Sequence, residues 1–133
     1  MKNKYLLIGT HGEFGKELVK SAEMIMGKTE NVYVFSLLPD MDPMDYVQSI
    51  RDTLSQLDGE FLCLVDLYGG TPSNMFAMLS REYQISVISG LNLGMFLEVY
   101  SNFEMKTIPE LKEVALSSLN QSGRDVLKTI FQK

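Results

Sequence analysis

Four short apolar runs, each followed by a longer stretch with helical periodicity, constrain the fold of this chain more than any other feature. The runs are Tyr5–Ile8, Val32–Leu38, Phe61–Val65 and Ile85–Ile88. Strands that alternate with helices form a parallel sheet with right-handed crossovers. The third run holds no polar residue, which indicates a strand covered on both faces. We therefore predict an α/β fold, a doubly wound and mainly parallel sheet with helices on both of its faces.

The stretches between the runs carry helix start signals. Asp42 and Thr107 each stand before a proline in the first turn of a predicted helix, as N-cap residues do. We expect helices over residues 13–26, 42–57, 73–83, 92–100 and 107–119, with Ser73 or Asn74 capping the third. Periodicity does not decide between a short helix and an edge strand for the residues from Arg124 onward.

The composition limits the kinds of site that the chain can form. The 133 residues include one histidine, His11, which excludes a zinc site of several histidines and a triad with a second imidazole. They include one cysteine, Cys63, which excludes a disulfide framework within the chain. The length fits one domain, residues 1–133. A net charge of -5 argues against a nucleic-acid partner. Apolar runs this short neither span a membrane nor form a signal peptide, so we expect a cytoplasmic protein.

Polar residues follow the first and third apolar runs. His11 lies in the loop after the first run, just ahead of a helix, and Asp66 ends the third run. In open α/β sheets, ligand sites lie beyond the carboxyl ends of the strands, where the strand order reverses. Because both loops open on this edge of a parallel sheet, we expect the two side chains to meet.

This pairing predicts phosphoryl chemistry on the imidazole. A carboxylate that accepts from one ring nitrogen fixes the tautomer and makes the other nitrogen a better nucleophile. Gly12 and Gly70 allow close backbone approach, a helix start favours an anion, and the Thr71 hydroxyl can donate to a phosphoryl oxygen. No carboxylate cluster for Mg²⁺ is evident in the sequence, so we expect a reaction without metal or cofactor.

The same residues also allow other interpretations. Gly12–Gly15 fits the second half of a dinucleotide fingerprint, but Thr10 stands where the first glycine is needed. A lone histidine in a loop is usually structural or solvated, and an aspartate ending a strand is often a cap or turn residue. A small-molecule enzyme that uses His11 as a general base also stays open.

Three segments carry a family resemblance. Leu7–Gly12, Asp66–Asn74 and Gly90–Asn92 together resemble the IIA component of mannose-family sugar phosphotransferase systems, and the similarity covers essentially the whole chain. The resemblance implies that His11 takes a phosphoryl group from the phosphocarrier protein HPr and passes it to a histidine of a IIB component. It also implies that Asp66 bonds the other ring nitrogen and that Thr71 lines the phosphoryl site.

The resemblance has consequences for assembly as well. It implies a homodimer in which an antiparallel edge strand, formed by part of residues 124–131, is exchanged between subunits beside four parallel strands. Because the chain ends at Lys133, we expect IIB to be a separate protein. A regulatory module that is phosphorylated as a signal, without feeding a transporter, is the alternative. The sugar is bound by membrane components in this family, so these loops do not encode it.

Overall fold

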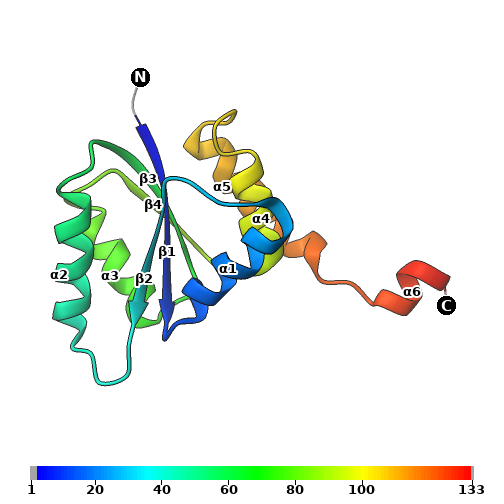
Figure 1. Cartoon of the computed structure of the whole chain (residues 1–133), viewed down its shortest axis with the longest axis horizontal. Helices are drawn as coiled ribbons and strands as arrows, with labels where there is room; N and C mark the ends of the chain where they lie inside the picture. The colour runs from blue at the N-terminus through cyan, green and yellow to red at the C-terminus, as the bar shows by residue number, and fades with distance from the viewer. Residues whose placement is uncertain (1–2, 133) are drawn as a thin grey trace.

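The computed structural model describes residues 3–132 and has the predicted α/β architecture (Figure 1). Its strands are β1 (Asn3–His11), β2 (Val32–Leu37), β3 (Gly59–Val65) and β4 (Ile85–Ser89). They form one sheet in the order β2-β1-β3-β4, and every neighbouring pair is parallel. All four apolar runs are thus confirmed as strands.

Helices connect and follow the strands. They are α1 (Phe14–Met26), α2 (Pro43–Leu54), α3 (Thr71–Leu79), α4 (Leu93–Ser101), α5 (Ile108–Ser122) and α6 (Val126–Phe131). Asp42 and Thr107 cap α2 and α5 as predicted, because their side chains accept the N–H groups of Met44 and Glu110. Within residues 3–132, no helix is both long enough and apolar enough to cross a bilayer.

The start of α3 differs from the prediction. The N-cap is Gly70 and the helix begins at Thr71, so neither Ser73 nor Asn74 caps it. Pro72 lies in the first turn, where its missing N–H costs no helical hydrogen bond. Pro72 therefore lies within the helix instead of preceding it, and Thr71 belongs to the helix and not to the loop.

Two apolar layers sandwich the sheet. Leu6 and Ile8 of β1 pack with α1, α4 and α5, whereas Leu7 between them packs with α2 and α3 on the opposite face. All three are fully buried, and so are the residues at the centre of β3. The alternation of side chains along a strand gives each face its own core. Helices on both faces, visible in Figure 1, confirm the doubly wound prediction.

The strand order reverses between β1 and β3. The chain leaves β1 for β2 on one side, then returns past β1 to form β3 and β4 on the other. The carboxyl ends of β1 and β3 therefore flank the switch point, where open α/β sheets place their ligands.

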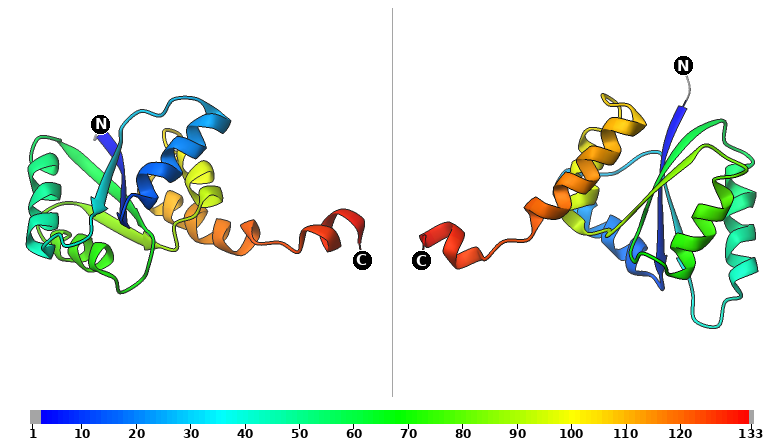
Figure 2. Two further views of the ribbon diagram at one scale, coloured as in Figure 1. Left: turned by 60° about the horizontal axis from the view of Figure 1, so that its bottom comes forward. Right: turned by 180° about the vertical axis from the view of Figure 1, so that it is seen from behind.

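The C-terminal segment is not the expected edge strand. Residues Val126–Phe131 form α6, which extends away from the body of the molecule in all three views of Figures 1 and 2. The Asp125 side chain caps it by accepting the N–H of Lys128. A helix pairs its own backbone groups, whereas a strand with no neighbouring strand leaves them unpaired, so the helix is the favoured state of this segment in one chain.

Candidate active site at the switch point

His11 and Asp66 meet at the switch point, as predicted. The Nδ1 atom of His11 lies 3.0 Å from Oδ2 of Asp66, and the same oxygen accepts the backbone N–H of His11 at 2.9 Å. His11 is the last residue of β1, paired with Leu37 of β2, and not a loop residue as the sequence suggested. One carboxylate oxygen therefore holds both the backbone and the ring of a residue anchored in the sheet.

The free nitrogen of the ring points toward α3. Because Nδ1 faces a carboxylate, the ring proton belongs on Nδ1 and the lone pair on Nε2. A methyl group added to Gly70 would lie 2.7 Å from Cε1 and 3.3 Å from Nε2 of His11, so the ring edge rests against the N-cap of α3. The His11 side chain is 46% exposed, against 15% for Asp66. The nucleophilic edge is thus accessible while its partner is shielded.

The first turn of α3 lies on the side of the His11 ring opposite Asp66. The first N–H groups of a helix have no partner within the helix, and the positive end of its dipole favours an anion. Thr71, the first residue of α3, follows Gly70 directly and carries a hydroxyl at this end. Gly70 therefore lies against the His11 ring, and Thr71 is the next residue along the chain.

Gly12 contributes differently from the prediction. Its N–H donates to the carbonyl of Leu37 at 2.7 Å, so this donor is already used within the protein. Its φ of +56° lies in the left-handed region, which favours glycine and turns the chain from β1 into α1. Gly12 therefore shapes the turn after His11, and the start of α3 is better placed to hold an anion.

The second oxygen of Asp66 has an unusual environment. Oδ1 is buried and has no hydrogen-bond partner among the described residues. The hydroxyl of the buried Tyr46 donates to the carbonyl of Phe35. Burial raises the pKa of Tyr46, and the charges of Cys63 and Asp66 raise it further. A carboxylate with one oxygen unpaired is poorly stabilised. Among the described residues, the Asp66 carboxylate therefore makes its hydrogen bonds to His11 alone, through Oδ2.

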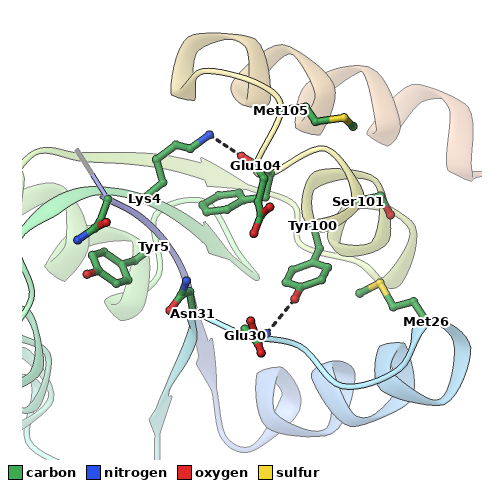
Figure 3. Close-up of a pocket in the computed structure, with 11 residues that line it drawn as sticks. Lys4, Tyr5, Met26, Glu30, Asn31, Tyr100, Ser101, Glu104 and Met105 are labelled. Atoms are coloured by element: carbon green, nitrogen blue, oxygen red, sulfur yellow. Dashed lines mark hydrogen bonds between the residues drawn. The ribbon is translucent and has the colours of Figure 1, made fainter. Parts of the chain in front are cut away.

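A sizeable cavity lies elsewhere. It measures about 930 Å³ and opens at the amino ends of the strands, between the start of β1 and the turn after α4 (Figure 3). In it the Tyr100 hydroxyl accepts the N–H of Glu30, and Lys4 donates to the carbonyls of Phe103 and Lys106. Neither His11 nor Asp66 lines it. The His11–Asp66 pair thus lies outside this cavity, at the carboxyl edge of the sheet.

Comparison with known proteins identifies the family. The family model described as PTS system fructose IIA component, EIIA-man, matches residues 5–116. The chain belongs to the EIIA-man family. It is 30% identical to the mannose-specific EIIAB component of Escherichia coli K12, over 96% of this chain and 40% of that protein. It is 28% identical to the fructose-specific EIIA component of Bacillus subtilis 168, over 96% of this chain and 89% of that protein.

Solved structures agree with this assignment. The crystal structure of a phosphotransferase system component EIIA from Streptococcus agalactiae superposes with a TM-score of 0.86 at 30% identity, covering 93% of this chain and 98% of that one. The chain spans 40% of the length of the E. coli mannose protein, so it matches only part of that relative. It is a mannose-family IIA component of a sugar phosphotransferase system, a class of phosphotransfer proteins, as the sequence resemblance implies.

The contact between Gly70 and His11 gives a prediction for this IIA component. Gly70→Ala will slow phosphoryl acceptance about tenfold or more, because the new methyl group displaces the ring edge that carries Nε2. The φ of Gly70 is -80°, which alanine adopts freely, so the fold will persist. The rate of phosphorylation and the thermal unfolding midpoint are the measurements.

A matched control comes from Gly123. A methyl group there meets nothing within 4 Å, so Gly123→Ala replaces a glycine with no contact to disturb. Equal rates for Gly70→Ala and Gly123→Ala would show that the ring does not rest on Gly70 in solution.

Proposed function

We propose that the protein is a phosphohistidine carrier that accepts a phosphoryl group from HPr on Nε2 of His11 and passes it to a IIB component for sugar uptake. It acts in the cytoplasm as a single IIA domain over residues 1–133, without metal or cofactor. The observation that carries the proposal is the 3.0 Å contact between His11 Nδ1 and Asp66 Oδ2, with the opposite ring edge against the start of α3.

The transfer balances without a further reactant. The lone pair of Nε2 attacks the phosphorus of the donor's phosphohistidine, the donor's P–N bond breaks, and its electron pair returns to the donor nitrogen. His11 keeps its proton on Nδ1, where Asp66 stabilises the positive charge of the phosphorylated ring. The N–H groups at the start of α3 and the Thr71 hydroxyl hold the phosphoryl oxygens. Attack by a histidine of IIB then returns the electron pair to Nε2.

Exposed apolar side chains around His11 support transfer between proteins. Phe14, Leu38, Leu67 and Tyr68 each lie within three residues of the carboxyl end of β1, β2 or β3, and each is more than two fifths exposed, Tyr68 reaching 85%. Exposed apolar groups clustered at one edge are typical of an interaction surface. A small-molecule enzyme with His11 as general base has no need of such a surface, so this feature favours a protein partner.

The proposal is tested with purified components. Incubation with phosphoenolpyruvate, enzyme I and HPr will add the mass of one phosphoryl group, and adding IIB after phosphoenolpyruvate and the donor proteins are removed will lower the phosphorylated fraction. Phospho-HPr separated from enzyme I and supplied in EDTA will phosphorylate the protein equally well if no metal takes part. Absence of a mass gain, while HPr itself is phosphorylated, would refute the proposal.

The C-terminal segment supports a homodimer. Val126, Leu127, Ile130 and Phe131 are each more than 60% exposed on α6, which lies away from its own body. We propose that a second copy covers these side chains by exchange of this segment, with part of residues 124–131 as the edge strand in the dimer. Light scattering will give the mass of two chains for the full protein and of one chain after truncation at Ser122; a full-length monomer would contradict this.

A further inference from the structure

Thr10, the residue before His11 in β1, is a buried polar residue whose hydroxyl hydrogen-bonds to the first turn of α1. It is fully buried, and its Oγ1 accepts the N–H of Gly15 at 2.8 Å. The same hydroxyl lies 3.5 Å from the carbonyl oxygen of Gly12, to which it donates. One hydroxyl in the strand thus spans the turn that follows His11.

The contact replaces a missing helix cap. The N-cap residue of α1 is Glu13, whose side chain makes no capping hydrogen bond, whereas Asp42, Asn92 and Thr107 cap their own helices. The free N–H groups of a helix start need an acceptor when they are buried. Because Thr10 supplies it from the strand, the hydroxyl ties the end of β1 to the first turn of α1.

The fit between Thr10 and α1 is close. Gly15 is buried, and a methyl group on it would lie 2.8 Å from Cγ2 of Ile8 and 3.0 Å from Oγ1 of Thr10. Three hydrogen bonds hold the turn between β1 and α1. The Asp66 carboxylate accepts the backbone N–H of His11, and the carbonyl of Leu37 accepts that of Gly12. The Thr10 hydroxyl accepts the N–H of Gly15. The last of these fixes where α1 begins relative to His11.

We propose that Thr10 is a positioning residue for phosphoryl transfer: its hydroxyl holds the turn from Gly12 to Gly15 in the shape that directs Nε2 of His11 at the start of α3. The inference rests on the proposed function of His11 as phosphoryl acceptor. Thr10 touches neither the ring nor the phosphoryl group, and it acts through the backbone that carries His11.

The experiment compares Thr10→Val, which keeps the shape and loses the hydroxyl, with Thr10→Ser, which keeps the hydroxyl. Thr10→Val will accept phosphate from phospho-HPr about tenfold or more slowly, and Thr10→Ser will remain near the wild-type rate. The ¹⁵N shifts of the single imidazole will move in the valine variant, because its ring is no longer held in one orientation toward Asp66. Ser118→Ala is the control, since it removes another buried hydroxyl, in α5, and will leave the rate unchanged.

Two results would overturn the proposal. One is a folded Thr10→Val variant with wild-type rate and wild-type ring shifts. The other, independent of whether that variant folds, is rapid amide hydrogen exchange at Gly15 in the wild-type protein, because the proposal requires this N–H to be hydrogen-bonded. If instead wild type and Ser118→Ala both fail to gain phosphate, the proposed function fails, while the ring shifts and Gly15 exchange still report on Thr10.

Discussion

Replacing His11 with glutamine will abolish phosphoryl acceptance and leave the fold intact. His11 is the chain's one histidine, so no second imidazole can take over the reaction. Its side chain is about half exposed, and the glutamine amide can still donate to Asp66, so we expect a stability change within about 1 kcal/mol. Intact mass after incubation with phospho-HPr and the thermal unfolding midpoint are the two measurements.

The outcome separates two interpretations of the site. A phosphoryl group found on the glutamine variant would mean that a residue other than His11 is the acceptor. Loss of both phosphorylation and the unfolding transition would instead mean that His11 is needed for folding, which its exposed position at the end of β1 argues against.

The Asp66→Asn variant is expected to slow phosphoryl acceptance about a hundredfold or more. The carboxylate oxygen Oδ2 accepts from the ring at Nδ1, so the lone pair stays on Nε2. An asparagine can turn its amide N–H toward Nδ1, which favours the tautomer with a proton on Nε2 and no lone pair there. Transfer rates from phospho-HPr and ring ¹⁵N shifts will report the two effects together.

Glu82→Gln is a suitable control for the loss of a carboxylate. Glu82 forms an exposed ion pair with Arg51 at 2.9 Å, which lowers the pKa of Glu82, and it lies on no element of the site. We expect its transfer rate to equal that of the wild type. A wild-type rate in Asp66→Asn as well would remove Asp66 from the mechanism.

The contact between His11 and Asp66 is predictable from the sequence because the sheet topology brings the two residues together. Apolar runs separated by helical stretches define a parallel sheet, and parallel strands bring their following residues to one edge. His11 and Asp66 could therefore be paired across 55 positions of sequence, and the structure has them in contact. The resemblance to mannose-family IIA components, now supported by the family match, rests on the same residues.

The details that the sequence did not predict depend on backbone hydrogen bonds. Thr10 and His11 are polar, so the apolar pattern ends before them, yet pairing with Ser36 and Leu37 of β2 extends β1 to His11. Likewise the N–H of Gly12 is used by a carbonyl of β2, which no side-chain pattern reveals.

The conformation of the C-terminal segment is not predictable from the sequence, for a different reason. Val126–Phe131 has no strand beside it in the single chain, and it forms α6 with its own backbone bonds. Whether a strand or a helix forms there depends on a neighbour that lies outside one chain's sequence pattern.

A ¹H–³¹P correlation spectrum of the phosphorylated protein tests most directly whether Nε2 of His11 carries the phosphoryl group. Nε2 lies between the two ring carbons that bear hydrogen, whereas Nδ1 adjoins only one of them. We predict one phosphorus signal coupled to both ring protons of the single histidine. Coupling to one ring proton would place the phosphoryl group on Nδ1, the nitrogen that faces Asp66, and coupling to no ring proton would place it on another residue; either result contradicts the account.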